Sequence, residues 1–147
     1  MIPPFARTKC GCSGCVDLCK THPGYLMPGD AEMIARNLGI SVHDLSPRLA
    51  ASPGAVVRDK QTNVDYRIPT IIAAPDATGR CNFLDEFDRC SIHDFAPFGC
   101  AYFDSHEGGE RAATKSMWAL RLIADDDSYH ALRMTLQPTR SYKPKGY

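Results

Sequence analysis

The sequence has little that would direct the chain to a membrane or to a nucleic acid. It contains no apolar run long enough to span a bilayer, and residues 1–7 lack the apolar core of a secretory signal. Its 17 lysine and arginine residues are balanced by 17 aspartate and glutamate residues, so no excess charge attracts phosphate or anionic lipid. We therefore expect a cytoplasmic protein that binds neither nucleic acid nor membrane.

Familiar catalytic motifs are also absent. The sequence has neither the G-x-S-x-G of a nucleophilic serine nor a phosphate-binding loop. Its two acidic stretches, 85–88 and 125–127, are typical of a surface turn and of a helix start. The cysteine order of radical-SAM enzymes is reversed, and the cysteine run of bacterial ferredoxins is missing. These absences leave no catalytic residue to assign.

Cysteine, in contrast, is abundant and clustered. The seven cysteines form two groups, one of Cys10, Cys12, Cys15 and Cys19, the other of Cys81, Cys90 and Cys100. An odd number of cysteines in a reducing compartment argues against a disulfide framework. Two glycines and a serine within the first group let the backbone bend so that several sulfurs face one point. We predict that the two groups meet around metal, with redox-active thiols as the alternative.

The predicted ligands are Cys12, Cys15, Cys19, Cys81, Cys90 and Cys100. Three histidines are further candidates: His22 and His93 each lie three residues after a cysteine, and His106 follows Cys100. For each of them the alternative is an ordinary surface or hydrogen-bonded histidine. Cys10 is set apart from the predicted ligands, because two thiols separated by one residue rarely bind one ion. It could be a spare thiol, a resolving thiol or a ligand of a second metal.

Periodicity and capping residues predict a small irregular α+β domain with short helices, a minor β-hairpin and a C-terminal helical pair. Helices are expected at 30–38, capped by Asp30 and ended by Gly39, at 42 onward with Ser41 as cap and Pro47 limiting its length, at 110–124, and after 125–127. Strands are expected at 55–58, 64–68 and 70–73, with a turn at 51–54. No internal repeat is evident. One domain would occupy 1–137, and 138–147 would form a flexible basic tail.

The two cysteine groups resemble the YkgJ-type family of zinc- or iron-chelating domains, which has a CxxCxxxCC signature. The matching segments are Cys12-x2-Cys15-x3-Cys19, then Cys81-Asn82-Phe83-Leu84-Asp85, Cys90-Ser91-Ile92-His93 and Pro97-Phe98-Gly99-Cys100. The chain departs from the family at Lys20, where a second cysteine is usual, at His93 in place of tyrosine and at Ala96 in place of arginine. The resemblance implies a bound zinc or iron.

Three functions are compatible with this pattern. The first is a metal-binding protein that holds a [4Fe–4S] cluster or zinc, acts in electron transfer or metal handling, and has an unknown redox or protein partner. An iron–sulfur cluster is favoured slightly, because a glycine-rich loop can donate backbone N–H groups to its sulfides. The second is a metal-dependent enzyme with an open coordination position. The third is a zinc-stabilised protein-interaction module.

Overall fold

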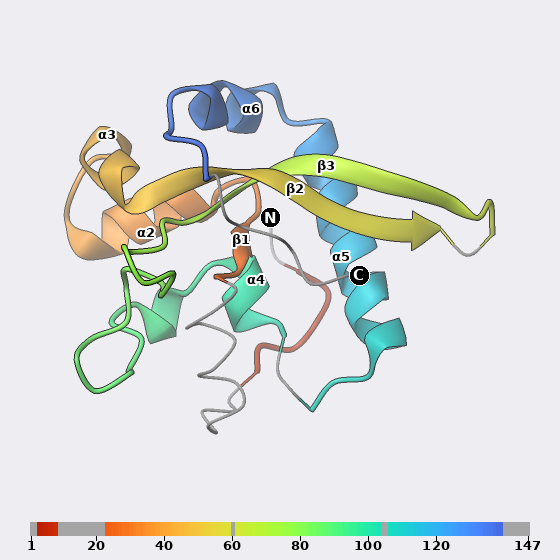
Figure 1. Ribbon diagram of the computed structural model, residues 1–147, viewed down its shortest axis with the longest axis horizontal. Coiled ribbons are helices and arrows are strands. Elements are labelled where there is room, and N and C mark those ends of the chain that lie inside the picture. The colour runs from red at the N-terminus through yellow and green to blue at the C-terminus, as the bar shows by residue number, and fades with distance from the viewer. Residues whose placement is uncertain (1–2, 9–22, 60, 104–105, 140–147) are drawn as a thin grey trace.

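The computed structural model describes residues 3–8, 23–59, 61–103 and 106–139, and within this part the chain is an α+β domain (Figure 1). The elements in chain order are β1 Tyr25–Leu26, α2 Asp30–Leu38, α3 Val42–Leu45, the 3-10 turn η1 Ser46–Arg48, β2 Leu49–Asp59, β3 Val64–Ala73, the 3-10 turn η2 His93–Phe95, α4 Phe98–Ala101, α5 Gly109–Ala124 and α6 Asp127–Met134. The predicted fold class is confirmed. Among the described residues, no helix has the length and apolar content needed to cross a bilayer.

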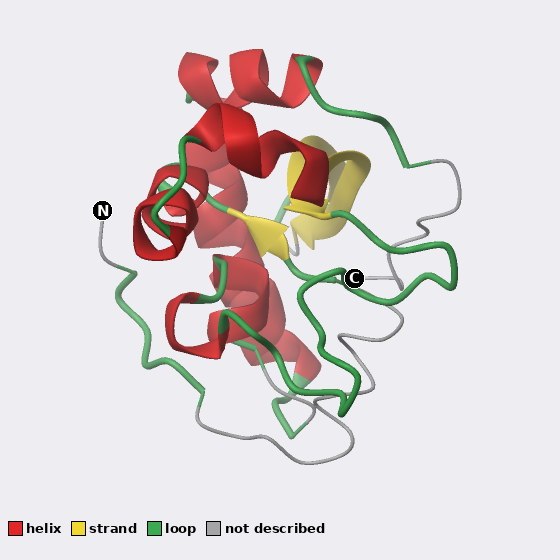
Figure 2. Ribbon diagram, turned by 90° about the vertical axis from the view of Figure 1, so that its left-hand side faces the viewer, coloured by secondary structure: helices red, strands yellow, loops and turns green. Residues whose placement is uncertain are grey.

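The three strands form an antiparallel sheet in the order β1-β3-β2. Figure 2 shows helices above, beside and below the strands, with long loops on the remaining side. In Figure 1 the far ends of β2 and β3 project to the right, beyond α5, as a two-stranded arm. Residues 64–67 are exposed, whereas Thr70–Ala73 are buried. The hairpin thus has one half in the core and one half in solvent.

The predicted hairpin is confirmed but is longer than its local sequence indicates. The predicted turn at 51–54 is wrong, because this segment continues β2 through a β-bulge between Ser52 and Ala55. Gly54 makes the bulge feasible: its φ is 123°, and a Cβ there would lie 2.4 Å from the Ile68 carbonyl oxygen. The piece expected at 70–73 is the second half of β3 rather than a separate strand.

The helix predictions are confirmed in position and corrected in one cap. The Ser41 Oγ accepts the Asp44 N–H, as expected of an N-cap, and Gly39 ends α2 with φ 71°. Asp30, however, is the first residue of α2 and not its cap, because Gly29 with φ 92° occupies the cap position. The start of the predicted tail is described as well: the Thr139 N–H donates to the Ala51 C=O, and Pro138 pairs with Ala51. Residues 140–147 lie outside the described part.

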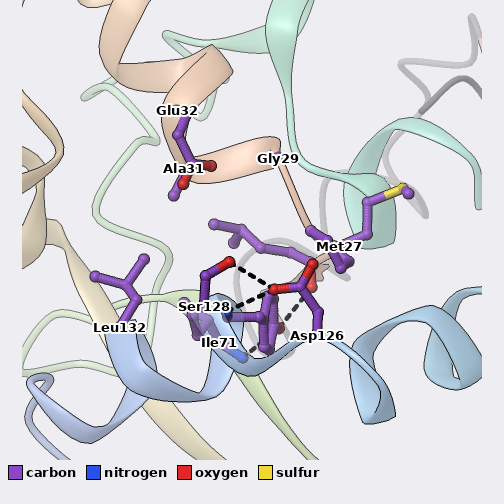
Figure 3. A pocket seen from close by; sticks show the side chains of 11 residues that line it. Met27, Gly29, Ala31, Glu32, Ile71, Asp126, Ser128 and Leu132 are labelled. Atoms are coloured by element: carbon purple, nitrogen blue, oxygen red, sulfur yellow. Dashed lines mark hydrogen bonds between the residues drawn. The ribbon is translucent and has the colours of Figure 1, made fainter.

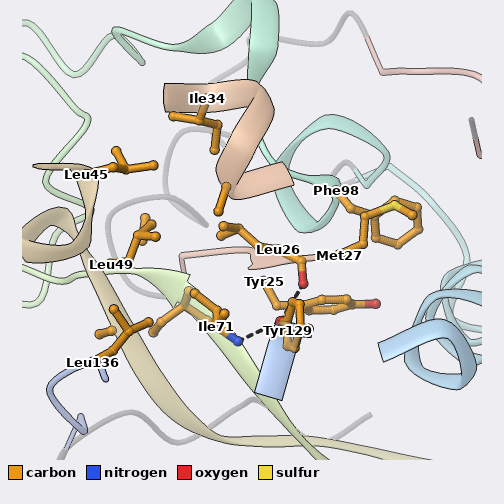
Figure 4. Close-up of a cluster of buried hydrophobic side chains, with 14 of the residues drawn as sticks. Tyr25, Leu26, Met27, Ile34, Leu45, Leu49, Ile71, Phe98, Tyr129 and Leu136 are labelled. Carbon is orange, nitrogen blue, oxygen red and sulfur yellow. Dashed lines mark hydrogen bonds between the residues drawn. The ribbon is translucent and has the colours of Figure 1, made fainter. Parts of the chain in front are cut away.

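The hydrophobic core lies where α2, α5 and α6 meet the inner half of the sheet (Figure 4). Its fully buried side chains include Leu26, Ile34, Ile71, Phe98 and Ile123. Burial of such side chains contributes roughly 1.5–3 kcal/mol each. Strand β1 is only two residues long, and both of its residues are buried in this core. It therefore depends on tertiary packing and not on intrinsic strand propensity.

Tyr129 of α6 completes the pairing between β1 and β3. Its hydroxyl donates to the Leu26 C=O (2.6 Å) and accepts the Ile71 N–H (2.7 Å), and these two residues are opposite each other in the register. Burial raises the pKa of Tyr129 well above its ordinary value, so the hydroxyl keeps its proton. One side chain thereby satisfies two buried backbone groups and fixes α6 to the sheet.

Tyr129→Phe should lower the free energy of unfolding by about 2–4 kcal/mol, because it leaves a buried C=O and a buried N–H without a partner. Urea unfolding followed by circular dichroism measures this change. Tyr66→Phe is the matched control, since Tyr66 is 41% exposed, and it should change stability by less than about 0.5 kcal/mol. Equal effects of the two substitutions would contradict the assigned role of Tyr129.

Candidate metal centre

The segment that carries Cys81 and Cys90 contains a nine-residue repeat, which corrects the expectation that the chain has no internal repeat. Asp76 and Asp85 begin two loops with the common pattern Asp-x3-Arg-Cys. In each loop the aspartate carboxylate accepts the backbone N–H groups two and four residues later. The aspartate N–H donates to the arginine C=O, and the residue three positions after the aspartate has a positive φ. Hydrogen bonding within each loop therefore gives both cysteines the same backbone setting.

The repeat continues beyond the cysteines. The C=O of each cysteine accepts the N–H three residues later, and each cysteine forms an isolated β-bridge with the residue before its loop. Phe83 and Ile92, two residues after the cysteines, are both 1% exposed and anchor the loops in the core. Arg80 of the first loop forms an ion pair with Asp88 of the second. The two loops are thus equivalent units in contact with each other.

The first loop is also attached to the end of η1. Arg48 Nε donates to Asn82 Oδ1 (2.8 Å), and Asn82 Nδ2 donates back to the Arg48 C=O (2.8 Å). The Arg48 guanidinium lies over the Phe83 ring, 4.1 Å from its centroid, in a cation–π contact. Because Asn82 and Phe83 directly follow Cys81, these contacts determine where the backbone of that cysteine lies.

Cys100 lies in α4, at the point where two distant backbones touch. A Cβ on Gly99 would lie 2.3 Å from Tyr25 N, and a Cβ on Gly24 would lie 2.3 Å from the Gly99 carbonyl carbon and 2.5 Å from Cys100 N. No side chain larger than hydrogen fits at either position. The segment that leaves the first cysteine group therefore passes directly against Cys100.

Asp30 holds this contact in place. Its Oδ2 accepts the Met27 N–H (2.9 Å) and the Phe98 N–H (2.8 Å), so one carboxylate links the start of α2 to the start of α4. Burial raises the pKa of Asp30 from its ordinary 3.8 to about 6, although the two N–H groups act in the opposite direction. The residue expected to cap α2 instead positions the helix that carries Cys100.

The chain that enters the first cysteine group is fixed in the same region. The Thr8 N–H donates to the Ala101 C=O (2.8 Å), one residue after Cys100. Arg7 Nη2 donates to the His93 C=O (3.2 Å), and its guanidinium lies 6.0 Å from the centroid of the Tyr102 ring. Both ends of the segment 9–22, which lies outside the described part, are therefore anchored beside Cys100 and the second cysteine group.

A buried ion pair fixes the chain after Cys100 to α5. Lys115 is 5% exposed, and its Nζ donates to the Tyr102 C=O (2.7 Å) and pairs with Glu107. Phe98 of α4 packs on Trp118, with ring centroids 5.7 Å apart. Cys100 therefore lies in a helix that packs against α5. The expected convergence of the two cysteine groups beside the C-terminal helical pair stays a prediction, because the first group lies outside the described residues.

The structure places some candidate ligands and leaves others outside its description. Cys81 is buried, Cys90 and Cys100 are half-buried, and His93 and His106 are exposed. Cys10, Cys12, Cys15, Cys19 and His22 lie outside the described residues. Within the described ranges, no three His, Cys, Asp or Glu side chains are close enough together to hold a metal ion.

The candidate ligands among the described residues are cysteines and histidines, and thiolates and imidazoles are ligands that zinc and iron–sulfur clusters accept. A small pocket between the starts of α2 and α6 is separate from these residues, since none of the candidate ligands lines it (Figure 3). There, hydrogen bonds from Ser128 and from the Tyr129 N–H hold the pKa of Asp126 below its usual range. The Asp126 carboxylate is the N-cap of α6, since it accepts the Tyr129 N–H.

No family model, curated protein or solved structure matches this chain. The resemblance to the YkgJ-type family thus remains an expectation based on the cysteine spacing.

Gly99→Ala should destabilise the protein by about 2–4 kcal/mol, because the new methyl group would overlap the backbone at Tyr25. Gly109→Ala is the matched control: a Cβ there meets nothing within 4 Å, and the residue begins α5. This control should be neutral or stabilising by up to about 1 kcal/mol. Denaturant unfolding of both variants measures the difference, and equal stabilities would show that the glycine contact is not tight.

Asp30→Asn should remove a pH dependence of stability. Since the folded-state pKa is raised from 3.8 to about 6, the folded protein holds a proton that the unfolded chain releases. The stabilising contribution is present below pH 4 and is lost as the pH rises through 6, by about 3 kcal/mol. The amide oxygen can still accept both N–H groups. Unfolding free energies of the two proteins should therefore diverge in favour of Asn between pH 4 and pH 7, and parallel curves would disprove this role.

Proposed function

We propose that this protein binds a metal centre through two cysteine groups, with Cys12, Cys15, Cys19, Cys81, Cys90 and Cys100 as ligands. The observation that carries the proposal is the anchoring of both ends of 9–22 beside Cys100. Before the segment, the Thr8 N–H donates to the Ala101 C=O, and after it the Gly24 backbone contacts the Gly99 backbone. A segment with fixed ends has a reduced loop-closure entropy, so its thiolates are kept near the second group at little further entropic expense.

The equivalent loops at Cys81 and Cys90 support the same proposal. A metal binds thiolates, and ligands presented by a backbone that is already hydrogen-bonded lose little conformational freedom on binding. In each loop the aspartate carboxylate and the backbone groups form hydrogen bonds that hold the chain on both sides of the cysteine, as a positioned metal ligand would need. Such a centre would supply electron transfer if it is an iron–sulfur cluster, or structural or Lewis-acid chemistry if it is zinc.

The ligand count leaves room for both metals. Six cysteines exceed the four of a single tetrahedral site, so His93, His106, His22 or Cys10 would complete a second ion or serve as alternatives. We favour a [4Fe–4S] cluster slightly over zinc, because a glycine-rich loop of closely spaced thiols can donate backbone N–H groups to the sulfides of a cluster. On this proposal the protein acts in the cytoplasm with a redox or protein partner.

A second candidate function is an interaction module stabilised by zinc. The observation that favours it is the projecting β2–β3 arm, on which Val64 and Tyr66 are 46% and 41% exposed. For the third candidate, an enzyme with an open metal position, the described residues offer no specific observation in its favour.

Protein purified without oxygen should contain either about four irons with matching sulfide and broad visible absorption, or stoichiometric zinc without colour. Cys90→Ser and Cys15→Ser should each reduce the metal content and the melting temperature together, since the metal and the fold share their ligands. Elemental analysis and thermal unfolding check both.

Ser91→Ala, next to Cys90 and exposed, is the matched control and should retain full metal. Full metal content and unchanged melting temperature in both cysteine variants would disprove the shared site. A metal-free wild-type protein prepared under both aerobic and anaerobic conditions would disprove metal binding altogether.

A further inference from the structure

We propose that the exposed edge of β3 pairs with the same edge of a second copy of this chain, antiparallel and with the two-fold axis at Tyr66. This inference concerns the β2–β3 arm and is independent of the metal. The edge that would pair is the segment 64–68, on the side of β3 that faces away from β2.

This edge is open in the described part of the protein. Strand β1 pairs with β3 only at Ile71 and Ile72, and no other described strand follows it along 64–68. In Figure 1 this half of the hairpin stands clear of the helices. A strand edge of this kind presents unpaired N–H and C=O groups and is a template for adding another strand.

The direction of the backbone groups determines which residues can pair. The Ile71 N–H points away from β2, since it donates to the Tyr129 hydroxyl between β1 and β3. Backbone groups alternate along an antiparallel strand, so Asp65 and Arg67 also point their N–H and C=O outward. Pro69 is also one of the residues whose backbone groups point away from β2, so its lack of an N–H removes no hydrogen bond between β3 and β2. Asp65 and Arg67 are the residues that would bond to a second strand.

The side chains make this edge complementary to itself. With the axis at Tyr66, Asp65 is opposite Arg67 of the other copy, and Arg67 is opposite its Asp65. Val64 is then opposite Ile68, and Tyr66 is opposite Tyr66. Two ion pairs would form across the interface, in the two residue pairs that also exchange backbone hydrogen bonds. Moving the axis by one residue to Asp65 or Arg67 places like charges opposite each other, which disfavours both neighbouring registers.

The arm's own pairing agrees with this arrangement. Arg58 of β2 forms an ion pair with Asp65 (2.9 Å) on the same face, so the combined sheet would carry a row of alternating charges. On the opposite face, Val64, Tyr66 and Ile68 alternate with these charged residues along β3, and Val64 and Tyr66 are exposed in the single chain. Pairing two arms would join the two apolar faces into one.

The contact is small, because each copy contributes one five-residue segment. Interfaces at the low end of the size range are weak and reversible, so we expect a dissociation constant in the micromolar range. Sedimentation velocity from low micromolar to millimolar concentration, in reducing buffer, should show a monomer–dimer equilibrium.

Charge variants test the register. Asp65→Arg alone and Arg67→Asp alone each place two like-charge pairs across the interface and should weaken self-association at least about tenfold. An equimolar mixture of the two variants restores opposite charges in both pairs, so it should form heterodimers with near wild-type affinity. Arg121→Asp, at an exposed position of α5, makes the same change of charge as Arg67→Asp away from the interface and should leave dimerisation unaltered.

A cysteine scan tests the axis directly. Tyr66→Cys should cross-link to itself under mild oxidation, because residues at a non-hydrogen-bonded position on the axis have Cα atoms about 4.5 Å apart. In Val64→Cys the two copies of residue 64 would lie roughly 13 Å apart, since they are offset by four residues along the strand. This variant should therefore cross-link no more than wild type. A monomer at all concentrations, a dimer insensitive to both charge variants, or cross-linking at residue 64 rather than 66 would each overturn the proposal.

Discussion

The architecture around the cysteines depends on one contact, the crossing of the backbones at Gly24 and Gly99. Each glycine lies so close to the backbone of the other segment that a methyl group at either position would overlap it. Asp30 reinforces the crossing by accepting one N–H from each side of it. A buried carboxylate is unfavourable in itself, and the two N–H groups that it accepts from distant segments offset this cost only in part, since its pKa stays raised. The crossing, together with the Asp30 bonds, fixes the position of α4 relative to the chain that follows the first cysteine group.

The two cysteine groups are held by different kinds of contact. Short-range hydrogen bonds shape the loops of the second group, whereas contacts with residues far along the chain fix the flanks of the first. The loops at Cys81 and Cys90 carry their own hydrogen bonds, so each is shaped largely by its nine residues. The segment 9–22 instead has its described flanks fixed by residues about ninety positions later, through Thr8 and Ala101.

Sequence reasoning succeeded where signals are local. The capping of α3 by Ser41, the end of α2 at Gly39 and the long helix after Gly108 depend on residues within one turn. It failed where an element depends on partners far away: β1 has two residues and α4 has four, and both exist because of core contacts. Asp30 illustrates the limit, since its position suggests a cap whereas its bonds are tertiary. The repeat of Asp-x3-Arg-Cys was visible in the sequence, but only its identical hydrogen bonds show that it is structural.

The long separation between Gly24 and Gly99 has a consequence for biosynthesis. Cys19 leaves the ribosome 81 residues ahead of Cys100, which at ordinary elongation rates is about 4–16 s. During that interval the first four thiols have no crossing to close against and no second group to share a metal with. For the metal centre proposed above, insertion would therefore follow synthesis of most of the chain, and the early cysteines of the nascent protein would depend on a reducing environment to stay unoxidised.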